Sequence, residues 1–312
     1  MSEEIVKVPT TGIEICHESF GSPGDPPLLL VMGLGTQMIA WPDDFCRDLA
    51  SRGYRVIRFD NRDTGRSTHL DHLPAPDPVR VMLRREEPPY RIGEMALDAL
   101  GLLDALGIPS AHVAGASMGG FIAQQMALAS PERLRSLSLV MTSTGSVRVG
   151  RPRPGLLLRL GRDRRPGLDR DGAIEFVLEV GRQIGSPAYP ADLDYLRELA
   201  GRSYDRAYDP AGYLRQVGAI MSQPNRTRQL RSIALPTVVI HGLADPLVAP
   251  SGGRAIAAAV PGARFVGLPG MGHDLPRPLW VRIADEISET AAAGERRMSP
   301  TGPGRAPGVR SR

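Results

Sequence analysis

Three residues that can cooperate in nucleophilic catalysis lie far apart in the chain, namely Ser117, Asp245 and His273. A serine hydroxyl is a weak nucleophile at neutral pH and needs an adjacent base. A histidine base in turn needs an acid that fixes its tautomer and stabilises its charged form. Each of the three residues follows a predicted strand, and the carboxyl ends of parallel strands share one edge of a sheet. We therefore expect them to converge there as nucleophile, acid and base.

Ser117 is the central residue of the sequence GASMG, residues 115–119, which has G-x-S-x-G spacing. A short buried strand is predicted over residues 111–114, and an Ala-rich helical pattern follows the motif directly. Such a tight turn needs glycine or very small residues beside the serine, because a Cβ there would strike the neighbouring strand or helix. Free N–H groups at the start of the helix favour a developing negative charge. The motif predicts a nucleophile elbow.

Asp245 and His273 are better candidates than the other acids and histidines near strand ends. Asp274 is adjacent to His273, and adjacent side chains diverge, so we do not expect it to orient the imidazole. His112 begins the elbow strand and His241 ends a strand beside a glycine. Packing or a supporting hydrogen bond explains these two histidines.

Glycines also follow the apolar run of residues 28–32, in the sequence Gly33-Leu34-Gly35. Two glycines after a central strand let the backbone turn sharply and offer its N–H groups to a ligand. This turn would supply one half of an oxyanion hole if Ser117 lies beside it. An ordinary turn at the end of a strand is the alternative.

A turn rich in Asp, Asn, Gly and Ser is predicted over residues 61–67. Its charged side chains are expected to hold the loop by hydrogen bonds. His69, Asp71 and His72 follow and could be considered metal ligands, but no second cluster of ligands accompanies them. We expect a solvated loop there, and neither a metal nor another cofactor.

The chain has 312 residues, of which 42% are apolar, enough for one large α/β core with an inserted subdomain. No apolar run approaches the 18 residues of a membrane span, and the acidic N-terminus is unlike a signal peptide, so we expect a cytoplasmic protein. The only cysteines, Cys16 and Cys46, lie in predicted strand and helix. They are expected to be core thiols, without a disulfide or metal site.

The excess of positive charge is concentrated at the C-terminus. A last helix is predicted over residues 278–292, and the segment 294–312 carries five arginines and one glutamate. The 38 basic and 34 acidic residues of the whole chain therefore leave equal numbers in the body. We expect a disordered basic tail over 294–312, because a Gly/Pro/Arg segment cannot bury enough apolar surface to fold. A nucleic-acid partner is not expected.

Alternating strand and helix patterns predict a mostly parallel sheet with helices on both faces. The alternation stops after residue 142 and resumes near residue 235. A helical cap is therefore predicted over residues 143–232, inserted into a core domain of residues 1–142 and 233–293. Helical patterns in the cap cover residues 173–184, 191–203 and 211–221.

Two stretches are predicted to lack regular structure. Residues 74–90 carry five prolines and mixed charges, which predicts an irregular surface excursion. Residues 148–171 are rich in Arg and Pro. They are expected to form a mobile solvated loop, in preference to a basic lip that attracts an anionic substrate.

With these features in place, nearly all of residues 4–292 resembles the α/β-hydrolase superfamily. The order Ser, acid, His and the position of the cap match it. The segments LLLVMGLG, WPDDF, RFDNRDTGRS, GASMGG and LPGMGHDLP are similar to the aclacinomycin methylesterase-like subgroup. The resemblance implies a mostly parallel eight-stranded sheet flanked by helices, with a helical cap inserted after the sixth strand.

The resemblance also implies residue roles: Ser117 is the nucleophile, Asp245 the acid and His273 the base. The backbone N–H groups of Leu34 and Met118 then form the oxyanion hole. Met32 stands where the superfamily commonly has a His-Gly pair, and Asp63 where it commonly has Gly. Both departures also occur in the subgroup.

The leading interpretation is a cofactor-independent serine hydrolase acting through an acyl-enzyme. Its expected partner is a small-molecule substrate, a small or medium, largely apolar carboxylic ester. The resemblance extends this to a methyl ester of a polyketide-type natural product. Neither nucleic acid nor membrane is an expected partner, and the oligomeric state is left open. Three alternatives remain: lactone, C–C bond or perhydrolytic chemistry with the same triad, a slow-turnover ligand-binding or receptor protein, and an interaction protein that uses the Arg-rich segments.

Overall fold

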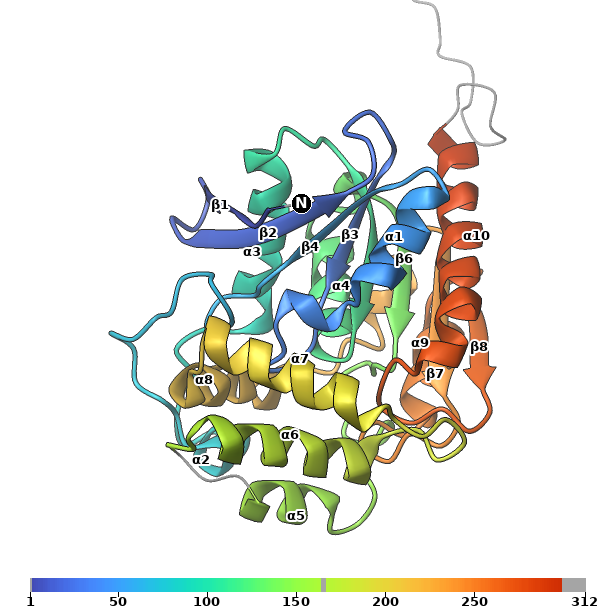
Figure 1. The fold of residues 1–312 in the computed structure, drawn as a ribbon. Coiled ribbons are helices and arrows are strands. Elements are labelled where there is room, and N and C mark those ends of the chain that lie inside the picture. The colour runs from blue at the N-terminus through green and yellow to red at the C-terminus, as the bar shows by residue number, and fades with distance from the viewer. Residues whose placement is uncertain (1, 164–166, 299–312) are drawn as a thin grey trace, which may run out of the picture.

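The computed structural model describes residues 2–163 and 167–298 and contains one eight-stranded sheet, in the order β1-β2-β4-β3-β5-β6-β7-β8 (Figure 1). Strand β2 pairs antiparallel with β1 and β4, and every other pairing is parallel. The prediction of a mostly parallel eight-stranded sheet is confirmed. The strands are β1 (Glu4–Lys7), β2 (Glu14–Phe20), β3 (Pro27–Val31), β4 (Arg55–Phe59), β5 (Ala111–Ala116), β6 (Leu134–Val140), β7 (Thr237–Gly242) and β8 (Arg264–Leu268).

Helices cover both faces of the sheet, because alternate residues of its central strands point to opposite sides. In β3, Leu28 and Leu30 pack in one cluster with α1 and α10, while Leu29 and Val31 pack in the other with α3, α4 and α9. The helices are α1 (Asp43–Ser51), α2 (Pro78–Met82), α3 (Ile92–Ala105), α4 (Met118–Ala129), α5 (Leu156–Asp163), α6 (Arg170–Ile184), α7 (Leu193–Arg206), α8 (Pro210–Met221), α9 (Ser251–Ala259) and α10 (Trp280–Met298). Short 3-10 turns are η1 (Met38–Ala40), η2 (Pro131–Arg133), η3 (Gln229–Ser232) and η4 (Arg277–Leu279).

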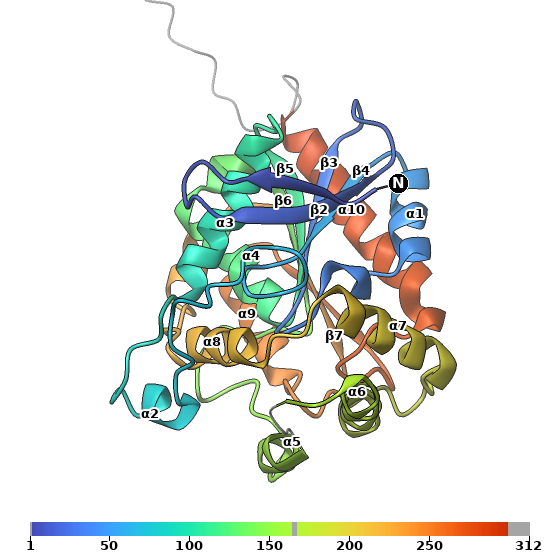
Figure 2. The ribbon, with the colours of Figure 1, turned by 60° about the vertical axis from the view of Figure 1, so that its left-hand side comes forward.

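The predicted helical cap consists of helices α5 to α8, which lie between β6 and β7 in the chain. Figures 1 and 2 show these helices together at the end of the sheet to which the strand arrows point. Helices α6, α7 and α8 match the three predicted helical patterns to within three residues at each end. The cap therefore faces the edge where Ser117, Asp245 and His273 are expected.

Two stretches expected to be irregular contain helices. Residues 78–82 form α2, which is N-capped by Asp77 and packs against α8. Residues 156–163 form α5, whose Leu156 is buried. Helix α2 is too short to display a hydrophobic period, and the Pro- and Arg-rich composition around α5 obscured its pattern.

The C-terminal boundary of the core was also predicted wrongly. Helix α10 runs to Met298, so residues 294–298 are helical and not part of a disordered tail. Tertiary contacts account for the extension, because Glu295 lies 2.9 Å from Arg135 and 3.0 Å from the buried His112. The remainder of the predicted tail, residues 299–312, lies outside the described residues.

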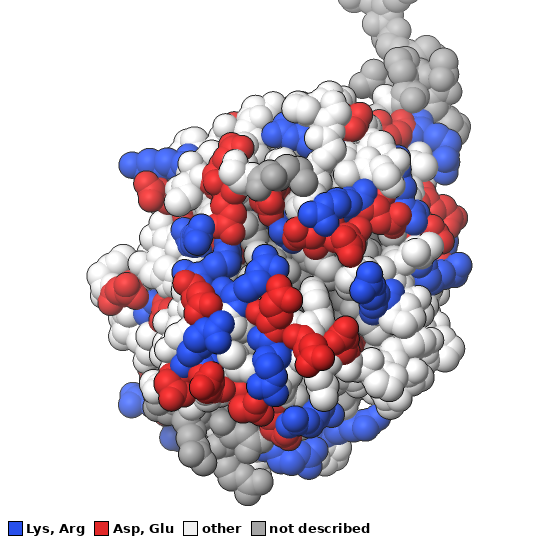
Figure 3. Space-filling view, viewed as in Figure 1, with Lys and Arg blue, Asp and Glu red and all other residues white. Residues whose placement is uncertain are grey.

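Charges of both signs are interspersed on the face of the molecule that carries α6 and α7 (Figure 3). The cap contributes the pairs Arg170–Asp205, Arg182–Glu179 and Arg197–Glu175 to this mixture. The face therefore presents no field of a single sign to a charged partner. Across residues 2–163 and 167–298, we find no helix of the length and apolarity that a membrane crossing requires.

Cys16 and Cys46 are buried free thiols, as predicted. Burial raises the pKa of both thiols to about 12, which suppresses the reactive thiolate form at neutral pH.

Candidate active site

Ser117 occupies a strained turn between β5 and α4. Its φ of 55° is positive, which a residue with a Cβ rarely adopts. Two hydrogen bonds to the end of the neighbouring strand hold the turn: the Ser117 N–H donates to the Val140 carbonyl at 2.9 Å, and the Thr142 hydroxyl donates to the Ser117 carbonyl at 2.8 Å. The surrounding structure thus fixes the strained residue, as is common at functional sites.

The glycines of the motif are required by close backbone contacts. A Cβ at Gly115 would lie 2.3 Å from the Gly119 carbonyl oxygen, and one at Gly119 would lie 2.1 Å from the Val31 carbonyl oxygen. A Cβ at Gly120 would lie 2.5 Å from the Thr142 side chain. These positions have the tight packing that the sequence motif predicts.

Gly119→Ala is expected to lower the free energy of unfolding by about 3 kcal/mol or more, because the new methyl group meets backbone that cannot rotate away. Gly93→Ala is the matched control, since Gly93 is also helical and a Cβ there has no neighbour within 4 Å. The control should be neutral or stabilise by up to about 1 kcal/mol. Urea unfolding measures both changes, and equal midpoints for the two variants would contradict this account of the elbow.

Ser117, His273 and Asp245 form a continuous hydrogen-bonded chain. The Ser117 Oγ lies 3.0 Å from His273 Nε2, and His273 Nδ1 lies 2.7 Å from Asp245 Oδ2. An ionised carboxylate only accepts hydrogen bonds, so Nδ1 carries the proton and Nε2 accepts from the serine hydroxyl. In this tautomer the imidazole can take the proton of Ser117, as a general base must.

Asp245 is buried, yet it is held in its ionised form. Burial alone would raise the pKa of Asp245, but the neighbouring imidazoles of His241 and His273 outweigh it and lower the pKa to about 2. The N–H groups of Leu247 and Val248 both donate to its Oδ1 at 2.8 Å. Asp245 Oδ2 is therefore the oxygen presented to His273.

The weaker candidates for the base and its acid, namely His241, His112 and Asp274, have other partners. His241 Nε2 donates to the Val248 carbonyl at 2.8 Å and lies 3.5 Å from Asp245 Oδ2, so it supports the acid. The fully buried His112 lies 2.9 Å from the Ser136 hydroxyl. Asp274 accepts a hydrogen bond from the Ser186 hydroxyl and not from His273.

The two backbone N–H groups predicted to form the oxyanion hole, those of Leu34 and Met118, belong to the two turns that meet at Ser117. Met118 is the first residue of α4, where N–H groups have no partner within the helix. The turn after β3 runs alongside, since a Cβ at Gly33 would lie 3.2 Å from the Ser117 Cβ. Within the described part of the chain, neither the Leu34 nor the Met118 N–H donates to another group. Both are available to a ligand oxygen.

The loop after β4 connects the core to the cap through ion pairs. Arg215 of α8 bonds both oxygens of Asp63, at 2.9 and 2.8 Å, and these two side chains are almost fully buried. Arg206 of α7 lies 2.8 Å from Asp60 and 2.9 Å from Glu3. The charged residues of this loop are structural, as predicted: Asp60 and Asp63 pair with cap residues, whereas Arg62 pairs with Asp98 of the core helix α3.

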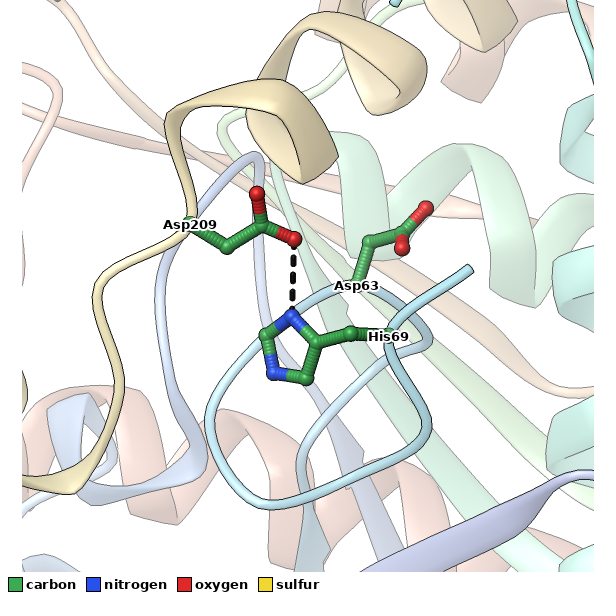
Figure 4. Close-up of side chains that lie close together, drawn as sticks. All are labelled: Asp63, His69 and Asp209. Atoms are coloured by element: carbon green, nitrogen blue, oxygen red, sulfur yellow. Dashed lines mark hydrogen bonds and ion pairs between the residues drawn. The ribbon is translucent and has the colours of Figure 1, made fainter. Parts of the chain in front are cut away.

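Figure 4 shows His69, Asp63 and Asp209 gathered at this junction. One potential ligand atom of each residue lies within 4.8 Å of the other two. Such a cluster could bind a metal, but Arg215 already pairs with Asp63 and lies 3.2 Å from Asp209. Tyr90 also donates to Asp63 at 2.7 Å. The Arg215 guanidinium supplies the positive charge that a metal ion would bring. We therefore interpret the cluster of Asp63, His69, Asp209 and Arg215 as an ion-paired contact, or latch, between core and cap.

His69 makes this latch sensitive to pH. Its Nδ1 lies 2.7 Å from Asp209 Oδ2 and its Nε2 lies 2.9 Å from the Gly65 carbonyl oxygen. Both partners only accept, so the doubly protonated imidazole satisfies both bonds. Burial lowers the pKa of His69, but the hydrogen bonds to Asp209 and Gly65, together with the charge of Asp63, outweigh it and raise the pKa.

The pKa of His69 is higher in the folded than in the unfolded protein, so its contribution to stability is complete below the unfolded pKa of about 6.5. That contribution is lost as the pH rises through the pKa of the folded protein. The difference in free energy of unfolding between wild type and His69→Gln should therefore be larger at pH 5.5 than at pH 9. Chemical unfolding at the two pH values measures it. A difference that grows with pH would show that the neutral imidazole is the bonded form.

Comparison with known proteins identifies the family of the chain. Residues 26–276 match the family described as the alpha/beta hydrolase fold. The rhodomycin D methylesterase DauP of Streptomyces sp. strain C5 is 32% identical over 304 residues, covering 90% of this chain and 96% of its own length. The rhodomycin D methylesterase DnrP of Streptomyces peucetius is 30% identical over 301 residues, with the same two coverages. An enol-lactonase structure from Burkholderia xenovorans LB400 has the same fold, with a TM-score of 0.68, 24% identity, and coverage of 94% of this chain and 99% of that one.

The chain belongs to the α/β-hydrolase fold family. Its relatives DauP and DnrP confirm the predicted resemblance to the methylesterase subgroup, and the enzyme is a hydrolase of ester bonds.

Sequence reasoning missed the polar cap residues that contact the loops of the site, chiefly Gln216 and Ser186. Ser186 accepts from the Gly272 N–H at 2.8 Å, and the Ile184 carbonyl accepts from the His273 N–H at 2.7 Å. No motif marks these positions. The only signal was the pair Arg215 and Gln216, which interrupts the apolar pattern of the predicted helix.

A cavity of about 360 Å³ also opens between α3, α4 and the end of α8. Its lining includes Ile92, Gln125 and Gln223, and no residue of the hydrogen-bonded chain. We do not assign it to the substrate.

Proposed function

We propose that the protein is a serine esterase in which Ser117 is the nucleophile, His273 the general base and Asp245 its orienting acid. The observation that carries the proposal is the hydrogen-bonded chain from Ser117 Oγ through His273 to Asp245, with distances of 3.0 and 2.7 Å. Such an arrangement activates a hydroxyl that is otherwise a poor nucleophile.

In the proposed reaction Ser117 Oγ attacks the ester carbonyl carbon while His273 Nε2 takes its proton. The N–H groups of Leu34 and Met118 stabilise the negative charge that develops on the carbonyl oxygen. His273 then gives the proton to the leaving alcohol, and an acyl-enzyme remains. Water, deprotonated by His273, attacks the acyl group and releases the carboxylic acid and Ser117.

For the substrate we propose a methyl ester of a largely apolar acid of polyketide type. The likeness to two rhodomycin D methylesterases over 90% of the chain supports the methyl ester. The carbonyl centre is common to all esters, so the acyl group must be distinguished by what encloses it. Tyr213 of the cap lies beside the turn that carries Leu34. Three other apolar cap residues, Leu157, Leu158 and Val177, are exposed to solvent.

A panel of methyl esters with acids from short aliphatic to polycyclic aromatic tests the proposal by methanol release. Turnover should rise with the apolar size of the acid, and rapid quenching should trap an acyl group on Ser117. A covalent phosphonate adduct at Ser117 without turnover of any ester would instead favour a binding or receptor protein.

A further inference from the structure

The turn after β3, residues 33–38, is held by the cap. The Gly35 N–H donates to Gln216 Oε1 of α8 at 2.7 Å. Gln216 is fully buried, and its Nε2 donates to the Arg62 carbonyl and to the Thr64 hydroxyl, both at 2.7 Å. The Arg62 carbonyl only accepts, so the amide nitrogen must face it and the amide oxygen must face Gly35. The core loop thus fixes the orientation of Gln216, and Gln216 fixes Gly35.

The cap also contacts this turn at two other points. Tyr213 packs so closely on Gly35 that a Cβ there would lie 2.5 Å from the ring. At the far end of the turn, Gln37 donates to the Ser203 and Ala207 carbonyls at the end of α7, at 2.7 and 3.0 Å. Elements of the cap therefore hold both ends of the turn.

The turn has little means of holding its own shape. Gly33 and Gly35 flank Leu34, Gly35 has a φ of 60°, and glycine accepts many backbone conformations. Its internal bonds are those of Thr36, whose N–H donates to the Gly33 carbonyl at 3.3 Å and whose hydroxyl donates to the Leu34 carbonyl at 3.0 Å. The bond to Gln216 is the shortest that restrains the backbone next to Leu34.

We propose that Gln216 is a positioning residue for the oxyanion hole. By holding the Gly35 N–H, it sets the backbone that aims the Leu34 N–H at the carbonyl oxygen of the substrate. The inference rests on the proposed function, in which the Leu34 N–H is one of two donors. In this role, Gln216 makes the cap a part of the catalytic apparatus, in addition to enclosing the substrate.

Gln216→Met tests the proposal, because methionine keeps the length of the side chain and removes all three hydrogen bonds. Loss of an oxyanion donor costs about 10² to 10³ in kcat, so a misaimed donor should lower kcat about ten-fold or more. KM should change less than about three-fold, because the donor acts mainly on the transition state. His69→Gln is the control, since His69 also links the core to α8, through Asp209 at the start of that helix, but makes neither of its hydrogen bonds with the turn.

A structural disturbance is separated from a positioning role by comparing a 4-nitrophenyl ester with its thionoester. A sulfur anion accepts hydrogen bonds more weakly than an oxygen anion, so an intact oxyanion hole favours the oxygen ester. The rate with the oxygen ester divided by the rate with the thionoester should fall about ten-fold in Gln216→Met. In His69→Gln this ratio should stay within two-fold of wild type. A general loosening of the active site would lower both rates together.

The inference is overturned if Gln216→Met keeps kcat within two-fold of wild type or leaves the ratio of rates unchanged. It is also overturned if the ratio falls as much in His69→Gln as in Gln216→Met. Should Gln216→Met not fold, Thr64→Val takes its place, because it removes one of the two acceptors that hold the Gln216 amide nitrogen and leaves the turn itself unchanged. A smaller fall of the same ratio is expected, and an unchanged ratio overturns the inference. If Ser117→Ala keeps its activity, the proposed function itself fails. An inactive Ser117→Ala beside a fully active Gln216→Met rejects the role of Gln216 alone.

Discussion

If Ser117 is the nucleophile, Ser117→Ala is expected to lower kcat for ester hydrolysis by about 10⁶-fold, the loss that removal of the triad serine produces in subtilisin. Without Oγ no acyl-enzyme can form, and only the oxyanion donors and binding remain. The variant should fold as wild type, because alanine has the same Cβ in the strained turn and the Ser117 backbone bonds to Val140 and Thr142 persist. Steady-state kinetics on an active ester, together with thermal unfolding, measure both effects.

Ser138→Ala is the matched control, since Ser138 is a buried serine on the neighbouring strand β6. Its activity should stay within two-fold of wild type, and a fluorophosphonate should label it as it labels wild type. Ser117→Ala should take up no label. If Ser117→Ala retains more than a few per cent of activity, another residue is the nucleophile.

The second large effect is expected for Asp245→Asn, at about 10⁴-fold in kcat. The N–H groups of Leu247 and Val248 both donate to Asp245 Oδ1, so they will select the amide oxygen of asparagine at that position. The amide NH₂ then faces His273 Nδ1, which must accept, and the proton moves to Nε2. In that tautomer His273 cannot take the proton of Ser117. The loss comes from the wrong tautomer, while the fold and the position of the ring remain.

Asp274→Asn provides the control for a carboxylate next to the same histidine. Its side-chain oxygen can still accept from the Ser186 hydroxyl, so the loss of kcat should be under about ten-fold. The NMR signals of the imidazole N–H groups should show the proton on Nδ1 in wild type and on Nε2 in Asp245→Asn. A larger loss in Asp274→Asn than in Asp245→Asn would reassign the acid.

We expect the cap to determine which acid the enzyme prefers, because the cap encloses the ester, but exchange of the whole cap would be a poor test. The cap supplies Gln216 to the turn after β3 and Ser186 to the loop of His273. A foreign cap would remove these contacts and alter the rate with every ester. Because Tyr213 also packs on Gly35, point changes at Tyr213 are compared by the ratio of rates across a series of acids, which a general loss of catalysis leaves unchanged.

The sequence by itself determined the elbow, the order of the triad candidates and the alternation of strands and helices. These features follow from rules that act over a few residues: glycines where a Cβ has no room, and apolar residues at the period of a buried strand or helix. Because these rules act over only a few residues, they did not predict α2, α5 or the last residues of α10. A five-residue helix has no period to read, and residues 294–298 are helical because Glu295 meets Arg135 and His112.

Only the tertiary structure decided which polar residues hold the site together. Gln216 and Gly35 lie 181 residues apart, and Arg215 and Asp63 lie 152 apart. Such pairs leave no local pattern, because each side chain alone is compatible with a solvated surface position. Their burial depends on how the cap packs over the ends of the strands. That packing brings a glutamine of α8 within hydrogen-bonding distance of the turn beside Ser117, and the sum of many long-range contacts, not any one segment, determines it.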